Sequence, residues 1–224
     1  MTFNRIHIGV FLGLAVLVWG SALLIQGVPV GREHLGPFGT VLGFLVLLGI
    51  GFEHVLWRQP WLQGWFVKRP DLRGTWRVDL RSDWVDPDTG ERIPSIVGYM
   101  GVTQTLSKLQ LHLMTPESES WFIADRIISS PCGDGYQVVG VYTNKPHVHL
   151  RGNRSEMHYG ALVLQTHGQS GKPESLTGEY WTDRKTAGSM TLSSRIADVA
   201  SRFEDAESQA THKDARHHAT EMAT

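Results

Sequence analysis

Two long stretches without a charged residue dominate the first quarter of this 224-residue chain. One covers residues 8–25 and the other covers residues 35–52, so each is 18 residues long. At about 1.5 Å per residue, a helix of this length spans roughly 27 Å, which is close to the ~30 Å hydrocarbon core of a bilayer. The two stretches therefore predict a transmembrane hairpin over residues 1–57, with helices at about 6–27 and 35–57.

Two other interpretations of the apolar stretches compete with the hairpin. They could form a pair of buried core helices, although core helices of soluble domains rarely run so far without polar residues. The first stretch could also be a cleaved signal peptide, but its leading segment carries only Arg5 and a second apolar stretch follows at once.

The positive charges around the two stretches predict the orientation of the hairpin. Arg32 is the only Lys or Arg between the stretches. Five Lys and Arg residues follow the second stretch, namely Arg58, Lys68, Arg69, Arg73 and Arg77. Because positive residues concentrate on the cytoplasmic side of membranes, this pattern predicts that both termini are cytoplasmic.

Small residues recur at a spacing of four in both predicted helices. Gly9 and Gly13 form one such pair, and Gly39 and Gly43 form the other. Glycines at this spacing allow helix backbones to approach closely in lipid. The pairs predict helix-packing faces that would permit self-association.

Three tryptophans follow the second helix at a spacing of four. Trp57, Trp61 and Trp65 lie at or within a predicted juxtamembrane linker over residues 58–71. Indole rings favour the headgroup layer of a membrane, so the three predict an interfacial belt. The alternative is that they pack on the domain that follows.

A period of two replaces the long apolar stretches from Leu72 onward. Leu72, Gly74, Trp76, Val78 and Leu80 alternate with polar residues, which is typical of a half-buried strand. We expect further strands near residues 93–105, 107–114, 121–129, 136–144, 157–167, 175–185 and 189–196. Eight strands joined by short turns predict an all-β fold, an eight-stranded antiparallel barrel over residues 72–197. A two-sheet sandwich is the alternative.

The last segment, residues 198–224, contains few large apolar residues after Phe203 and is rich in charge, alanine and histidine. Such a composition cannot bury enough apolar surface to form a core. It predicts a disordered tail.

Composition and motifs argue against several classes of function. The net charge of −1 argues against a protein that coats DNA or RNA polymers, and one cysteine excludes an intrachain disulfide. No catalytic motif is recognisable, so we expect that the protein is not an enzyme. His147 and His149 share one strand face but have no third ligand at a recognisable spacing, so no metal site is predicted.

Polar residues on strand faces that should point inward are the most informative positions. Tyr180, Thr182 and Arg184 share a face with the interior-type residues Leu176 and Gly178. In the same way, Tyr142 and Asn144 share a face with Val138 and Gly140, and Thr105 shares one with Thr103. An unpartnered buried polar group costs on the order of 2–7 kcal/mol. These residues therefore form either a polar ligand pocket or an internal hydrogen-bond network, and the pattern does not decide between them.

Several short motifs behind the predicted hairpin resemble those of a known family. In chain order they read PDLRGTWRV, VGYMGVTQTLSKLQLHL, GVYTNKP, MHYGALVL and LTGEYWTDRKTAGSMTL. Together, over residues 6–196, they resemble the two-transmembrane, β-barrel effectors of bacterial CBASS antiphage systems. The resemblance implies a cytoplasmic, lipocalin-like barrel that senses a cyclic dinucleotide made by a partner nucleotidyltransferase. It also implies a multi-pass protein of the bacterial inner membrane that forms homo-oligomers, contacts lipid and disrupts the membrane, which leads to abortive infection.

The resemblance also implies which residues bind the ligand. They are the residues that match the inner-barrel segments of the family: Tyr142, Asn144, Tyr180, Thr182, Arg184, Thr105 and His158. Trp76 matches the first-strand signature of lipocalin-type barrels and is expected to close the base. No cofactor besides the cyclic dinucleotide ligand is implied. The alternatives are a membrane-tethered lipocalin-like carrier or sensor of an apolar small molecule, and a membrane-bound hydrolase, for which no nucleophile and base are recognisable.

Overall fold

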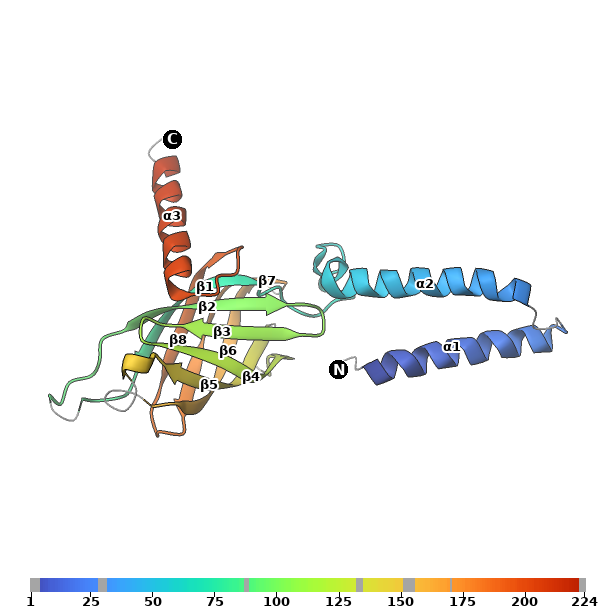
Figure 1. The fold of residues 1–224 in the computed structure, drawn as a ribbon. Helices are drawn as coiled ribbons and strands as arrows, with labels where there is room; N and C mark the ends of the chain where they lie inside the picture. The colour runs from blue at the N-terminus through green and yellow to red at the C-terminus, as the bar shows by residue number, and fades with distance from the viewer. Residues whose placement is uncertain are drawn as a thin grey trace. The chain divides into compact units, whose positions relative to one another are not determined.

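The computed structural model describes residues 5–27, 32–86, 89–131, 135–150, 156–169 and 171–221. It divides into two units, one of Met1–Gln59 with Thr105–Lys108 and one of Pro60–Gln104 with Leu109–Thr224. The first unit contains helix α1 (Arg5–Ile25), helix α2 (Arg32–His54) and the short 3-10 helix η1 (Leu56–Arg58) (Figure 1). The second unit contains all the strands.

Neither helix of the first unit meets the requirements for a membrane span. Within the described residues, no helix combines the length and the apolar character that crossing a bilayer demands. Helix α2 also includes Arg32, Glu33, Glu53 and His54. This finding contradicts the predictions of a transmembrane hairpin and of a multi-pass inner-membrane protein with both termini cytoplasmic.

The second unit is a closed barrel of eight antiparallel strands, in which each strand pairs with its neighbours in sequence and β1 pairs with β8. This confirms the all-β prediction and excludes the two-sheet sandwich. The strands are β1 (Gly74–Ser82), β2 (Ile96–Gln104), β3 (Leu109–Met114), β4 (Ser118–Ser129), β5 (Tyr136–Pro146), β6 (His158–Gln169), β7 (Lys172–Thr182) and β8 (Ala187–Ile196).

One end of the barrel is closed by apolar side chains around Trp76, which is fully buried. Its indole Nε1 donates a hydrogen bond of 2.8 Å to the carbonyl oxygen of Leu72. The guanidinium carbon of Arg195 lies 5.6 Å from the centre of its ring. The side chain of Gln104 binds the segment before β1 twice, accepting from Leu72 N and donating to Pro70 O, each at 2.8 Å. Trp76 thus closes the base of the barrel.

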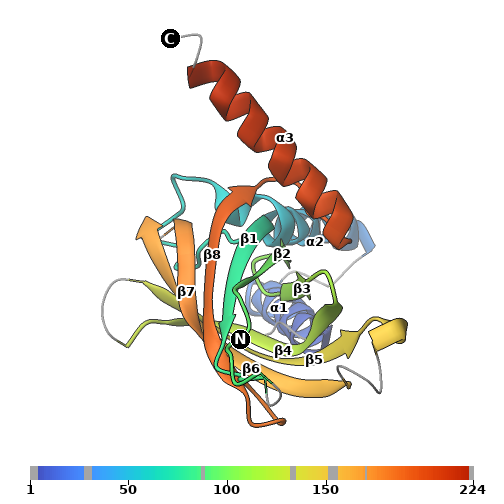
Figure 2. The ribbon, with the colours of Figure 1, turned by 90° about the vertical axis from the view of Figure 1, so that its left-hand side faces the viewer.

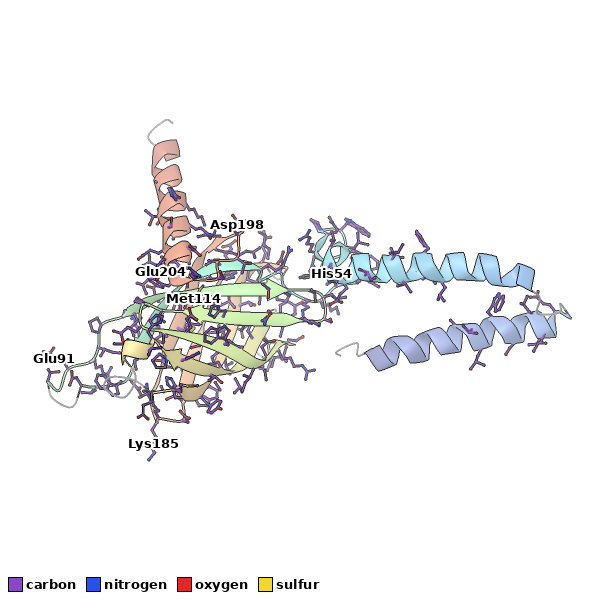
Figure 3. The ribbon with its side chains drawn as sticks, in the orientation of Figure 1. His54, Glu91, Met114, Lys185, Asp198 and Glu204 are labelled. Carbon is purple, nitrogen blue, oxygen red and sulfur yellow. The ribbon has the colours of Figure 1, made fainter. Side chains whose placement is uncertain are left out.

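The segment after the barrel forms helix α3 (Phe203–Glu221) where the sequence predicted a disordered tail. Ala206 is fully buried, and the ring centre of Phe203 lies 5.4 Å from that of Tyr99 on the outer face of β2. Met114 of β3, labelled in Figure 3, belongs to the same buried cluster as Tyr99 and Ala206. The apolar surface of α3 is small, and for this reason the sequence did not predict the helix. It is sufficient to hold the helix because its apolar residues pack on the buried Tyr99 and Met114.

A buried hydroxyl fixes the chain where α3 begins. The side chain of Thr75 donates to the carbonyl oxygen of Asp198 at 2.7 Å and accepts from the backbone N–H of Ala200 at 2.8 Å. A β carbon on Gly101 would lie 2.8 Å from the carbonyl oxygen of Ala200. The close approach of this segment therefore depends on the absence of a side chain at Gly101.

The three tryptophans after α2 have different environments. Trp57 is fully buried, whereas Trp61 and Trp65 are about two-thirds exposed, at 67% and 70%. The prediction that all three form one exposed belt is wrong for Trp57, because its ring is covered.

Candidate functional site

Polar side chains gather at the barrel end opposite Trp76, and we call this group the polar end. Its members are Tyr142 and Asn144 on β5, His158 on β6, and Tyr180 and Thr182 on β7. The strand register brings them together, since Asn144 pairs with His158 and Gly160 pairs with both Tyr142 and Thr182. Tyr142, Asn144, His158 and Tyr180 are buried, and Thr182 is half-buried.

Three aromatic rings of the interior lie over glycines of the next strand. A β carbon on Gly160 would lie 2.3 Å from the Cζ atom of Tyr142, and one on Gly188 would lie 2.6 Å from the ring of Tyr180. In the same way, the ring of Phe122 on β4 occupies the space beside Gly140. The rings therefore lie along the inner surface of the barrel because the neighbouring strand has no side chain there.

Two of these rings also contact each other. The ring centres of Phe122 and Tyr142 are 5.4 Å apart with an interplanar angle of 48°. Phe122 was missed in the sequence because a bulge between Phe122 and Ala124 shifts the register of β4. The pairing of inward aromatics with Gly140, Gly160 and Gly188 on adjacent strands was the signal that could have identified it.

The amide of Asn144 is held by two serines of β4. Its Nδ2 donates to Ser118 Oγ at 3.0 Å and to Ser120 Oγ at 2.9 Å. Both amide hydrogens are used in these bonds, so the Oδ1 atom is the part of this side chain that can accept from a ligand. The two serines were not predicted, although they lie at alternate positions of β4, as inward residues do.

His158 is neutral and has a defined tautomer. Its Nδ1 lies 3.1 Å from the carbonyl oxygen of Glu156, which can only accept, so Nδ1 carries the proton and Nε2 is an acceptor. Burial is the main cause that lowers the pKa of His158; the nearby Arg184 lowers it further, while the bond to Glu156 and the carboxylate of Asp183 raise it. The polar end therefore offers a neutral imidazole acceptor.

Both tyrosines of the polar end stay protonated. Burial is the main cause that raises the pKa of Tyr142, to which Tyr180 and Asp183 add and which Arg184 opposes. Burial also raises the pKa of Tyr180, while a hydrogen bond with Ser82 lowers it. Each phenol therefore remains a hydrogen-bond donor at neutral pH.

Two of the predicted ligand-binding residues lie outside the barrel interior. Arg184 is exposed in the turn between β7 and β8, next to Lys185, which Figure 3 shows at the tip of that turn. It is close enough to affect the pKa of Tyr142 and of His158. Thr105 lies in the loop after β2, in the first unit, where its hydroxyl donates to the carboxylate of Glu53. The polar end thus includes Arg184 at its rim and does not include Thr105.

The described residues hold no group of three or more His, Cys, Asp or Glu side chains that could bind a metal ion. The side chain of His149, which was considered as a ligand, lies outside the part that the structure describes.

The sequence of the barrel matches the model of a known receptor domain. The family model described as Cap15, cyclic dinucleotide receptor domain, matches residues 67–194. This range contains β1–β7 and most of β8, and it ends before α3. A comparison with curated proteins gave no match.

Proposed function

The chain belongs to the Cap15 cyclic dinucleotide receptor family of CBASS effectors, and on this premise we propose that the polar end of the barrel is where the ligand binds. The domain has a binding role, and its ligand is a cyclic dinucleotide. The proposed position of the ligand site is supported by one observation, namely that five polar residues lie together at one barrel end. They are Tyr142, Asn144, His158, Tyr180 and Thr182.

Each group of the polar end has a chemical counterpart in a cyclic dinucleotide. Aromatic rings along the inner surface can stack on bases. The Oδ1 of Asn144 and the Nε2 of His158 can accept from base edges, while the phenols of Tyr142 and Tyr180 can donate to them. The guanidinium of Arg184 at the rim can bind a phosphate.

The proposed site is tested by thermal unfolding of the full chain with a panel of cyclic dinucleotides. We expect at least one of them to raise the melting temperature. Arg184→Ala should weaken its binding by about 10- to 150-fold, because a charge-assisted hydrogen bond contributes about 1.5–3 kcal/mol. Lys185→Ala, which removes a neighbouring exposed charge, is the matched control and should bind like the parent. Equal binding by the parent and Arg184→Ala would refute the role of Arg184.

A fatty acid in the same assay tests the apolar carrier alternative. The interior near Trp76 is filled by a cluster that includes Met100, Leu164 and Leu192. An apolar carrier needs an open apolar cavity, so we expect no stabilisation by the fatty acid. Stabilisation by the fatty acid and by no cyclic dinucleotide would overturn the proposed function.

We also propose how the effector acts once the ligand is bound. In this proposal a partner nucleotidyltransferase supplies the cyclic dinucleotide, the bound chains self-associate, and the N-terminal helices contact and disturb lipid, which halts the infected cell. Large exposed side chains on α1 and α2, such as Leu17, Leu24 and Leu47, support it, because an apolar surface of this extent is normally covered. The proposal concerns lipid contact and does not include a membrane span.

The predicted glycine faces belong to the same proposal. A β carbon on Gly13, Gly39 or Gly43 would meet nothing within 4 Å, so helices of other copies could pack there; the surroundings of Gly9 lie outside the described part. Leucine at positions 39 and 43 should therefore weaken ligand-dependent leakage of dye from vesicles and leave ligand binding unchanged. Unchanged leakage would mean that these glycines are not used.

A further inference from the structure

The outer surface of β4–β7 exposes a continuous set of large apolar side chains. We call it the β4–β7 face. It lies away from α3, which contacts β2 and β8 (Figure 2). The strand register makes it continuous, since Ala124, Val141, Ala161 and Trp181 form one row across the four strands. Its exposed members are Trp121, Ile123, Val141, Tyr159 and Trp181, with exposures of 42%, 64%, 43%, 57% and 49%.

One aromatic ring of this face, and the backbone of a second aromatic residue, are held in place before any partner binds. The indole of Trp121 stacks on the imidazole of His112, with ring centres 4.9 Å apart and an interplanar angle of 13°. The backbone N–H of Tyr159 donates to Asp183 Oδ2 at 3.2 Å. Rigid aromatic residues lose little conformational entropy on binding and dominate the energy of many protein interfaces.

In one row of the face, the charges at the two ends are opposite in sign. Arg126 on β4 pairs with Val139, which pairs with Val163, which pairs with Glu179 on β7. The row therefore begins with a positive side chain, continues with two valines and ends with a negative side chain. A two-fold axis that runs along the strands, between β5 and β6, would lay β4 of one copy over β7 of another. Arg126 of each copy would then face Glu179 of the other, as in a self-complementary isologous interface.

We propose that the β4–β7 face is the surface through which a second copy of this chain packs, sheet against sheet. The inference rests on the self-association in the proposed function and names the surface that performs it. Four strands at a spacing of ~4.8 Å give a face about 15–20 Å wide, and strands of 11–12 residues at ~3.3 Å per residue make it about 36–40 Å long. Its area of roughly 500–800 Å² is at most that of a standard interface, which buries ~800 Å² per partner. A contact of this size is expected to be weak by itself, and the proposed function assigns its strengthening to the ligand-bound state.

A charge swap tests the proposed pairing in the full chain. Arg126→Glu alone and Glu179→Arg alone should each raise the dissociation constant for self-association by about 10-fold or more, because each places like charges opposite each other. The double variant Arg126→Glu with Glu179→Arg should restore self-association to near the parent level. Sedimentation with and without a cyclic dinucleotide measures the association. Arg81→Glu, an exposed arginine on β1, is the matched control and should behave like the parent.

Ligand binding is measured separately for every variant by thermal stabilisation. If the parent is stabilised by the ligand and the single variants self-associate like the parent, the proposed surface is wrong while the proposed function remains. If no cyclic dinucleotide stabilises the parent, the result contradicts the proposed function itself, on which the proposed surface rests. A double variant that stays dissociated would refute the two-fold pairing. Cross-linking of a cysteine at position 181 to α1 of the same chain would show that the N-terminal helices cover the face instead, and would also overturn the proposal.

Discussion

The ring of Tyr142 fills the space where a β carbon on Gly160 would lie, and this makes Gly160 a sensitive position of the proposed site. The nearest atoms to that β carbon are Cζ, Oη and Cε2 of Tyr142, all at the mobile tip of one side chain. We therefore expect Gly160→Ala to displace the ring, to weaken ligand binding by about 10-fold or more through lost stacking, and to leave the fold intact. Isothermal titration and a melting curve measure the two effects.

Gly188→Ala is the contrasting variant. There the added β carbon would lie 2.1 Å from the backbone oxygen of Arg81, which cannot move without shifting the strand. This variant should lose stability, whereas Gly160→Ala should not. Equal loss of stability in both would mean that Tyr142 belongs to a rigid internal network, the alternative that the sequence left open.

His112 makes the stability of the barrel depend on pH. Burial is the main cause that lowers its pKa below the ordinary value of 6.5, and Glu119 opposes this effect. Because the unfolded chain then binds the proton more readily, the free energy of unfolding is highest above pH 6.5 and falls as the pH falls through 6.5 toward the folded pKa. The pKa of His158 is also lowered, so this residue changes the free energy of unfolding with pH in the same direction.

His112→Phe isolates this contribution. Phenylalanine retains the stack on Trp121 and removes the titrating group. The loss of unfolding free energy between pH 7.5 and pH 5.5 should be smaller in the variant than in the parent, as measured by urea unfolding. An identical loss in both proteins would contradict the argument.

For β5 and β7, the sequence predicted correctly which side chains face inward. Period-two alternation fixes the face, so Tyr142, Asn144, Tyr180 and Thr182 were predicted correctly to face the interior. Arg184 was placed in the interior by extending the alternation past the end of β7, where the chain turns. Thr105 was misplaced for a different reason. Its face of β2, with Tyr99 and the exposed Thr103, points outward, whereas Met100 and Val102 point into the core.

Among the elements, the strands were predictable and α3 was not. Each strand carries its own alternating pattern, whereas the apolar stripe of α3 consists of Phe203 and two small residues, Ala206 and Ala210. These residues stabilise a helix only by packing on the buried Tyr99 and Met114 of the barrel. Both lie about one hundred residues earlier in the chain. Local composition therefore indicated disorder where a tertiary contact stabilises a helix.

Ala206→Glu tests whether this contact is what holds α3. A carboxylate at a fully buried position should release the helix from the barrel, because an unpaired buried charge is strongly unfavourable. We expect faster proteolysis after residue 200 and faster hydrogen exchange of the backbone amides of α3, with the barrel still folded. Ala215→Glu on the exposed part of α3 is the matched control. Equal protection in the two variants would contradict the docking role of Ala206.

A second prediction concerns Arg195, which lies at the base of the barrel beside Trp76. Arg195 on β8 donates to the carbonyl oxygen of Asp71 at 2.6 Å and lies over Trp76. Arg195→Ala should lower the free energy of unfolding by about 1.5–3 kcal/mol, the usual contribution of a hydrogen bond to a charged group. Ligand binding at the opposite end should be retained once the protein is folded. Denaturant titration provides the measurement, and a stability equal to that of the parent would contradict it.

For the whole molecule, the division into two units predicts that residues 60–224 fold without the first 59. The family match lies within this fragment, and the barrel is closed by its own strands. The fragment loses the contacts of Glu53, whose carboxylate accepts from the hydroxyls of Thr105 and Ser107 and whose carbonyl oxygen accepts from Leu106 N at 3.0 Å. These contacts are only partly buried, so water can replace them at a net cost of about 0.5–1.5 kcal/mol each.

We therefore expect the fragment to unfold cooperatively, with a melting temperature a few degrees below that of the full chain, and to retain the stabilisation by a cyclic dinucleotide. Circular dichroism should show strands together with the helix α3. Glu53→Gln in the full chain is the matched control, because it weakens the same contacts without removing the helices, and it should account for part of the shift. A fragment without cooperative unfolding would mean that the first unit is required for the barrel to close, so that its helices and the receptor domain fold as one.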